Sequence, residues 1–242
     1  QRLIDAVITD DPVVQAELLV LQGITNRELS RFSLAQRQPE EALQLHKQLG
    51  NHTGSIIVLT QLATLDGAEA KHTRAQERID AALRLIERHD IDPELIARVN
   101  IVATHTAVEL GQTESALAYS KMAIDILENL PGGPTLALAD AYEETSAIYG
   151  RMEQRDDLRY WAQKSIALYT ELEGPLYRDL GPAYSGVAIS FAMDGEYDQA
   201  REYFNREVSI AQANFGDEHV RTAVALLNLG GTLRRLGEYQ LA

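Results

Sequence analysis

Apolar and small residues recur along this chain in a pattern that repeats about every 42 residues. Residues 181–200 align with residues 223–242 at that offset, which carried backwards gives starts at Ala139 and Ala97, and one residue less reaches Ile56. In each unit one apolar or small stripe falls at relative positions 4, 7, 8 and 11, and a second at 20, 24, 27 and 28. Both stripes have helical spacing. The pattern therefore predicts five consecutive helix hairpins in phase.

Three positions of the repeat define how the hairpins are expected to pack. Positions 8 and 20 hold mostly small residues, which let two helices approach closely: Ala63, Thr104, Ser146, Ala188 and Gly230 at position 8, and Ala75, Ala116, Leu158, Ala200 and Ala242 at position 20. Position 11 supplies bulk between hairpins in the last three units, where it reads Tyr149, Phe191 and Leu233. Asp66 at this position is charged, which indicates a degenerate unit.

The periodicity and its breakers predict about twelve helices. We expect them at residues 2–8, 13–36, 40–49, 54–66, 71–89, 93–110, 113–130, 135–152, 155–172, 179–194, 197–213 and 218–236. Gly111, Gly195 and Gly237 occupy the turns inside hairpins, and Glu153 takes the place of glycine in another. Six of the seven prolines, Pro39 among them, are expected in loops or first helical turns, where the missing N–H costs nothing.

Each hairpin leaves one apolar face uncovered, so successive hairpins must stack into a continuous core. We expect a single solenoid over residues 1–242, with degenerate repeats in 1–54, clear repeats at 56–96, 97–138, 139–180 and 181–222, and a truncated repeat at 223–242. The first residue is Gln1, and the chain stops at Ala242 where a second helix should begin. Both features are expected of a piece of a longer protein.

The repeat resembles the tetratricopeptide repeat (TPR) family. The resemblance is carried by small-then-aromatic residues in the first helix, Gly195-Glu-Tyr and Gly237-Glu-Tyr in the turns, and alanine opening the second helix. The 42-residue period, with Phe215-Gly-Asp-Glu-His-Val-Arg-Thr-Ala between units, is similar to the kinesin-light-chain subtype. The resemblance implies an all-α, right-handed superhelical solenoid in which the first helix of each hairpin lines a concave groove that binds a protein or peptide.

By the same resemblance, relative positions 2, 5, 6, 9, 12 and 13 point into the groove. The candidate peptide-binding residues are Arg98, Ile101, His105, Glu109, Asp140, Glu143, Arg151, Ser185, Ile189, Met193, Val224, Asn228 and Arg235. In kinesin-light-chain-like repeats an asparagine at the place of Asn228 often hydrogen-bonds a peptide backbone. The strip Ile101, Ile189, Met193 and Val224 either binds an extended apolar segment or packs across a tightly wound superhelix. The carboxylates Asp140, Glu143 and Glu144 form either a solvated face or a contact for a basic peptide.

Composition and charge remove other classes of function. The formal net charge of −14 repels phosphate, and the longest basic feature is Arg234-Arg235, so no nucleic-acid partner is expected. Cysteine is absent, the six histidines lack metal-ligand spacing, and no catalytic motif occurs. We therefore expect no enzyme, no cofactor and no metal. The longest uncharged stretch, residues 48–65, is too polar to insert into a membrane.

A second resemblance is to the repeat regions that follow the membrane segment of many bacterial serine/threonine kinases. It is carried by Gln1-Arg-Leu-Ile-Asp, Asp10-Asp-Pro-Val-Val-Gln-Ala-Glu-Leu-Leu19, Phe215-Gly-Asp-Glu-His219 and Arg234-Arg-Leu-Gly-Glu-Tyr239. It implies the non-catalytic sensory or docking region of a larger signalling protein, across the membrane from the kinase domain. The alternative is the peptide-pheromone-responsive region of a bacterial transcription regulator. The sequence leaves the compartment, cytoplasmic or periplasmic, and the oligomeric state open.

Overall fold

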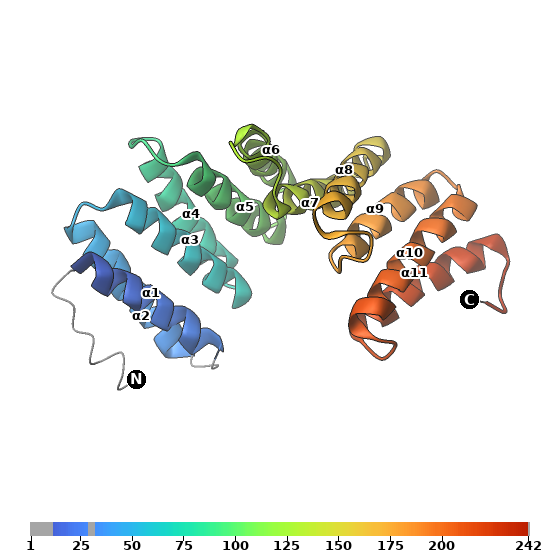
Figure 1. Cartoon of the computed structure of the whole chain (residues 1–242), viewed down its shortest axis with the longest axis horizontal. Helices are drawn as coiled ribbons and strands as arrows, with labels where there is room; N and C mark the ends of the chain where they lie inside the picture. Colours follow the sequence, from blue (N-terminus) through green and yellow to red (C-terminus); the bar gives the residue numbers. More distant parts are fainter. Residues whose placement is uncertain (1–11, 29–31, 242) are drawn as a thin grey trace. The chain divides into compact units, whose positions relative to one another are not determined.

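The computed structural model describes residues 12–28 and 32–241, and all regular elements of this part of the chain are α-helices (Figure 1). The eleven helices are α1 (Pro12–Glu28), α2 (Phe32–Gln48), α3 (His52–Ala68), α4 (His72–Ile86), α5 (Pro93–Glu109), α6 (Thr113–Asn129), α7 (Leu136–Arg151), α8 (Arg155–Glu173), α9 (Leu180–Met193), α10 (Tyr197–Phe215) and α11 (Val220–Leu236). The predicted helix at residues 2–8 lies outside the described residues.

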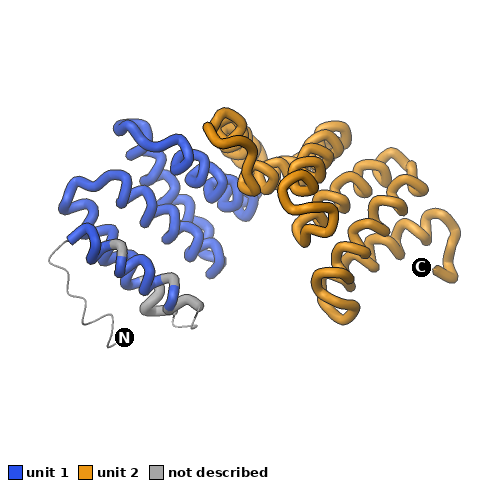
Figure 2. Tube along the Cα trace, in the orientation of Figure 1, with its two compact units in different colours: residues 1–112 blue, residues 113–242 orange. Residues whose placement is uncertain are grey.

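The chain forms two compact units, residues 1–112 and residues 113–242 (Figure 2). In the first unit, contacts join α1 to α2, α2 to α3, α3 to α4 and α4 to α5, and α3 also contacts α5. In the second unit, the same serial contacts run from α6 to α11, and α7 also contacts α9. Each unit is therefore a series of helices packed in chain order, as the predicted stacking of hairpins requires.

Most residues predicted at the helix crossings are buried, whereas Gly230 is half-buried and Ala242 lies outside the described residues. Ala63, Thr104, Ser146 and Ala188 at position 8 are buried, and so are Ala75, Ala116, Leu158 and Ala200 at position 20. At position 11, Tyr149 and Leu233 are buried and Phe191 is half-buried. The pattern of the repeat thus predicted the core at these positions.

The predicted boundary between the first two long helices was wrong. Instead of helices at 13–36 and 40–49, the chain forms α1, which ends at Glu28, and α2, which begins at Phe32. Pro39 lies inside α2 and is buried, not in a loop. An interior proline costs a helix about 3 kcal/mol, so the packing of α2 against α1 and α3 outweighs the local preference. The sequence holds no glycine or proline between Glu28 and Phe32 that would have indicated this boundary.

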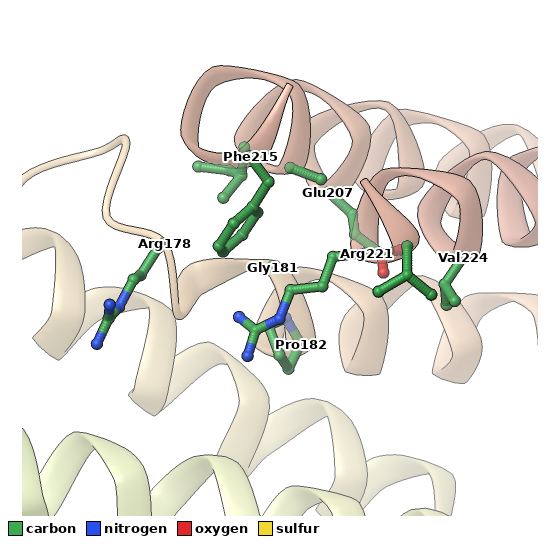
Figure 3. Close-up of a pocket in the computed structure, with 10 residues that line it drawn as sticks. Arg178, Gly181, Pro182, Glu207, Phe215, Arg221 and Val224 are labelled. Atoms are coloured by element: carbon green, nitrogen blue, oxygen red, sulfur yellow. The ribbon is translucent and has the colours of Figure 1, made fainter. Parts of the chain in front are cut away.

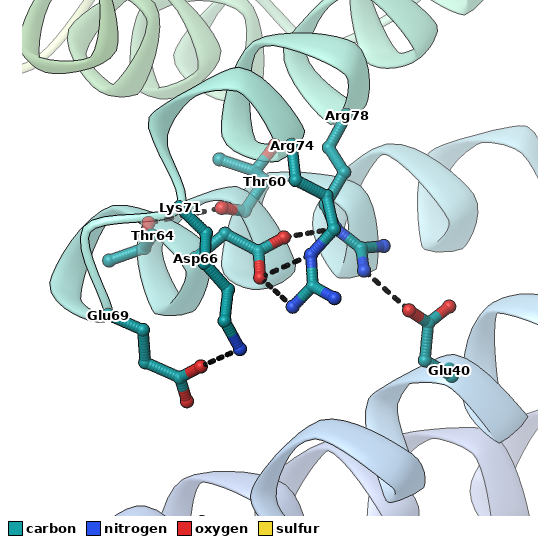
Figure 4. Close-up of polar contacts among 8 residues, drawn as sticks. All are labelled: Glu40, Thr60, Thr64, Asp66, Glu69, Lys71, Arg74 and Arg78. Atoms are coloured by element: carbon teal, nitrogen blue, oxygen red, sulfur yellow. Dashed lines mark hydrogen bonds and ion pairs between the residues drawn. The ribbon is translucent and has the colours of Figure 1, made fainter.

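Asp66 is buried on the core stripe of α3, and its charge is neutralised within the same hairpin. The carboxylate accepts hydrogen bonds from Arg74 and from Nε of Arg78, the latter at 2.6 Å, and both arginines come from α4. Arg78 also pairs with Glu40 of α2 (Figure 4). These hydrogen bonds raise the pKa of Arg74, and in Arg78 they outweigh the desolvation that lowers its pKa. Asp66 therefore holds α3 to α4 and, through Arg78, α2 to α4.

The turns inside hairpins lie at the predicted positions and adopt a left-handed backbone there. Gly111, Gly195 and Gly237 have φ of 70°, 80° and 80°, and Glu153 has φ of 57° at the equivalent turn. The N–H groups of Glu153 and Gln154 donate to the carbonyls of Gly150 and Tyr149, which closes the end of α7. A side chain with a Cβ is strained in this conformation.

Replacing Glu153 by glycine is therefore expected to raise the free energy of unfolding by about 1 kcal/mol. Glu153 is exposed, so the change removes backbone strain without removing packing. Urea denaturation of the variant and the wild type measures the difference. Glu153→Ala is the control, because alanine keeps the strained Cβ, and equal stabilisation by both variants would contradict the explanation.

Candidate functional site

A cavity of about 290 Å³ opens on the second unit where α9, α10 and α11 meet (Figure 3). Its lining is mainly apolar, with one carboxylate and two guanidinium groups. The lining residues are Arg178, Gly181, Pro182, Glu207, Ile210, Ala211, Phe215, Val220, Arg221 and Val224. A concave apolar surface with a few polar groups is the ordinary form of a binding site.

Hydrogen bonds between the ends of the helices fix the walls of this cavity. The Thr222 hydroxyl donates to the carbonyl of Gly216 at 2.7 Å, which ties the start of α11 to the end of α10. The side-chain amide of Asn214 donates to the carbonyl of Leu176 at 3.0 Å, which ties the end of α10 to the loop before α9. The imidazole of His219 accepts from the N–H of Arg221 at 3.1 Å and caps α11. The residues that line the cavity are therefore held in place by hydrogen bonds that connect α10 to α11 and to the loop before α9.

Glu207 brings a buried carboxyl group to the cavity from the apolar side of α10. Its exposed fraction is 9%, and its Oε2 accepts from Nδ2 of Asn228 at 3.5 Å. Burial raises the pKa of Glu207, and hydrogen bonds from Asn228 and Ser185 only partly offset that effect. Among the residues that the structure describes, none forms an ion pair with Glu207. The two arginines of the cavity, Arg178 and Arg221, pair instead with Asp179, at 3.3 and 3.8 Å.

Replacing Glu207 by glutamine is expected to raise the melting temperature at pH 8 by a few degrees and to change it little below pH 4. The folded-state pKa of Glu207 is raised above 4.5, so its protonated form favours folding, and this contribution is lost as the pH rises through the folded pKa. Glutamine imitates the protonated acid at every pH. The charged neighbours Arg178, Arg221 and Asp179 are the same in both proteins, and the arginines stay charged throughout.

Thermal denaturation between pH 3.5 and 8.5 measures this difference. Glu202→Gln is the matched control, because Glu202 lies on the same helix, is exposed and pairs with Arg206. A difference between Glu207→Gln and the wild type that does not change with pH would contradict a buried carboxyl with a raised pKa.

The predicted groove residues are divided between the two units. Arg98, Ile101, His105 and Glu109 lie on α5 of the first unit, where Ile101 is half-buried and the other three are exposed, with Arg98 3.6 Å from Glu94. The other nine lie on α7, α9 and α11 of the second unit. The groove as a set of thirteen residues stays a prediction.

Within the second unit, part of the predicted set converges on the cavity. Asn228 of α11 donates a hydrogen bond to Glu207, Ser185 of α9 lowers the pKa of Glu207, and Val224, one turn before Asn228, lines the cavity. Ile189 and Met193 follow Ser185 at four-residue spacing on α9 and are 43% and 36% exposed, and Val224 is 49% exposed. These exposed apolar residues, Ile189, Met193 and Val224, are called the apolar strip below.

The remaining predicted residues of the second unit lie elsewhere on their helices. Asp140 of α7 accepts a hydrogen bond from the hydroxyl of Tyr169; burial raises the pKa of that tyrosine, and this hydrogen bond raises it further. Glu143 is half-buried, and Arg151 and Arg235 are exposed near the ends of α7 and α11. At least one carboxylate of the predicted acidic face therefore helps to hold α8 against α7.

The sequence analysis missed Glu207, although the repeat contained a signal for it. Glu207 occupies relative position 27, on the apolar stripe of the second helix. The equivalent residues of the other hairpins, Ala82, Ala123 and Ser165, are fully buried and uncharged. The predicted binding residues all lie on the first helices of the hairpins, whereas Glu207 lies at a core position of a second helix, α10.

In the described part of the chain, no three His, Cys, Asp or Glu side chains come together to hold a metal ion. Likewise, none of the described helices has the length and apolar character needed to cross a bilayer.

Comparison with solved structures defines the class of fold. BtubC (BKLC) from P. vanneervenii aligns with 97% of this chain and 87% of its own, with a TM-score of 0.68 and 15% identity. A STAND (Signal Transduction ATPase with Numerous Domains) protein with a tetratricopeptide repeat sensor, from Pyrococcus horikoshii, aligns with 99% of this chain and 38% of its own, with a TM-score of 0.80 and 14% identity. A kinesin light chain with TPR-like repeats from Podosopora anserina covers 78% of this chain and 90% of its own, with a TM-score of 0.65 and 13% identity.

At these identities the likeness shows the fold alone, and it confirms the predicted fold class of stacked TPR-like helix hairpins. Residues 179–242, which contain nearly all of the cavity lining, match the tetratricopeptide repeat family in sequence. No protein of curated function matches the sequence significantly.

Proposed function

We propose that the second unit binds an extended peptide or protein segment over α9 and α11, and that the chain serves as a non-catalytic scaffold for protein interactions. The observation that carries this proposal is the cavity, which is lined from α9 and α11 and includes Val224 of the apolar strip, together with the exposure of Ile189 and Met193 further along α9. An extended segment that places one side chain in the cavity and others on the strip would bury apolar surface that the fold leaves exposed.

A TPR-like fold supports this reading, because such proteins bind protein or peptide segments. The solved STAND protein is described as having a tetratricopeptide repeat sensor, and its similarity extends over 99% of this chain. We propose accordingly that the chain is the sensory or docking region of a larger signalling protein. The kinase resemblance of the segment from Gln1 to Leu19 and the 42-residue period favour a serine/threonine kinase, and the full-length gene would identify the attached domain.

Selection of peptides from a random display library tests the binding proposal. We expect the wild-type chain to enrich a family of related peptides, and the double variant Ile189→Glu, Val224→Glu to bind them at least about tenfold more weakly. Both residues are exposed, so the substitutions should leave folding intact.

Met122→Glu is the matched control for the charge and the loss of apolar surface. Met122 is 50% exposed on α6, outside the apolar strip, and this variant should bind the selected peptides like the wild type. Failure to enrich any peptide, or equal binding by the double variant, would reject the proposed function.

A further inference from the structure

The carboxyl group of Glu207 is buried beside an open cavity, and none of the described residues forms an ion pair with it. Asn228 contacts it at 3.5 Å, a long hydrogen bond, and Ser185 is its other partner. Neither group carries a charge. Burying a carboxylate is costly unless an opposite charge accompanies it, so its presence here calls for an explanation.

Asp66 is a second buried carboxylate in this chain, and its charge is paired within the fold. That residue is 1% exposed and receives two guanidinium groups, from Arg74 and Arg78. Asp66 and Glu207 both place a charged group on an apolar stripe of the repeat, but only the charge of Asp66 is balanced by residues of its own hairpin. A ligand could supply a cation to Glu207, because the cavity next to Glu207 is open (Figure 3), whereas Asp66 already pairs with Arg74 and Arg78 (Figure 4).

The rest of the cavity suits a cation carried on an aliphatic stem. Pro182, Ile210 and Val224 provide apolar walls for methylene groups. The basic groups at the cavity are already engaged: Arg178 and Arg221 pair with Asp179, and the Arg221 guanidinium lies 4.9 Å from the Phe215 ring centre. An anionic side chain in the same place would meet the uncompensated carboxylate of Glu207.

We propose that this cavity is a specificity pocket for a lysine or arginine side chain of the bound segment, with the aliphatic stem against Pro182 and Val224 and the charged head on the Glu207 carboxylate. The inference rests on the proposed function, because the side chain belongs to the bound segment. It adds the chemical class of the partner, a segment that carries a basic residue where it passes the cavity between α9 and α11. Asn228 and Ser185 act as positioning residues that orient the carboxylate toward the cavity.

The pocket is tested first without any selected peptide, using N-acetyl-lysine methylamide as the ligand. NMR spectra of the full chain with ¹³C-labelled glutamate are recorded during titration with this compound, and with the uncharged N-acetyl-norleucine methylamide. We expect saturable shifts of the Glu207 carboxyl resonance with the lysine compound, and binding at least about tenfold weaker for norleucine and for the Glu207→Gln variant. Glu202→Gln, which removes an exposed charge from the same helix, should bind as the wild type does.

The titration also has a readout that a structural role of Glu207 would not produce. A bound cation favours the ionised carboxylate, so the pKa of Glu207 should fall when the lysine compound is added and stay constant when norleucine is added. Unchanged resonances, equal binding of the two compounds, or equal binding by Glu207→Gln would overturn the pocket.

Selected peptides separate this inference from the proposed function. We expect the enriched family to share one lysine or arginine, and its replacement by norleucine to weaken binding to the wild type at least about tenfold but to leave binding to Glu207→Gln nearly unchanged. Enriched peptides without a shared basic residue, bound through the apolar strip, would reject the pocket and keep the function. A family with a shared acidic residue would assign the site to Arg178 and Arg221 instead.

Discussion

Replacing Asp66 by alanine is expected to lower the free energy of unfolding of the first unit by about 3 kcal/mol. The substitution removes the common partner of two guanidinium groups. The Arg78 side chain is only 12% exposed and keeps a single carboxylate, Glu40, whereas Arg74 is 39% exposed and can turn toward water. The loss therefore lies at the lower end of that for a fully buried ion pair, with the cavity left by the carboxyl group adding to it.

Urea denaturation combined with amide hydrogen exchange measures this loss and assigns it to the first unit. The control is the triple variant Asp66→Leu, Arg74→Leu, Arg78→Met, which replaces the ionic group by apolar side chains of similar size. It should recover most of the stability, because leucine occupies the equivalent core position at Leu233. A loss below about 1 kcal/mol in Asp66→Ala would show that the ion pairs contribute little.

The contrast between Asp66 and its ion-pair partners shows what the repeat pattern could and could not predict. Alignment of the units placed position 11 in the core, and Asp66 is indeed buried there. Its charge suggested a degenerate unit, yet α3 and α4 form a regular hairpin. The partners Arg74 and Arg78 lie on the second helix of the hairpin, α4. A pattern of apolar positions cannot predict that a buried charge is paired with charges on the other helix.

Helix boundaries were predictable where the chain carries its own stop signals. Glycine with positive φ ends the first helix of three hairpins, and Asp92 followed by Pro93 begins α5 with a side-chain cap on the N–H of Glu94. The end of α1 at Glu28 carries no such signal, and Pro39 wrongly indicated a boundary inside α2. The packing of α2 against its neighbours decides these boundaries, and the pattern of one sequence contains no information on packing.

The candidate site was predictable to the extent that it follows the repeat. Ser185, Val224 and Asn228 were on the predicted list because their helices are first helices, and the structure brings all three to Glu207 or its cavity. Glu207 and Ile210 come from the second helix, α10, whose inner side was expected to be plain core. A binding pocket at the junction of three helices requires the exact spacing of those helices, which the sequence does not specify.

That spacing depends on Gly186, and replacing it by leucine is expected to cost about 3 kcal/mol of folding free energy. A Cβ at this position would lie 3.1 Å from Oγ of Ser146 and 3.3 Å from Cβ of Ala162, so α9 packs closely on both α7 and α8. The remaining atoms of leucine would have to push α9 away from these helices. Better helix propensity returns only about 1 kcal/mol of this cost.

Gly231→Leu is the matched control, because nothing lies within 4 Å of a Cβ added to this residue of α11, and it should be neutral or slightly stabilising. Urea denaturation of the two variants gives the stability difference. Because α9 carries Ser185 and Pro182 to the cavity, Gly186→Leu should also weaken binding of N-acetyl-lysine methylamide, whereas Gly231→Leu should not. Equal stability of the two variants would show that α9 can shift without cost and that this glycine does not set the spacing of the site.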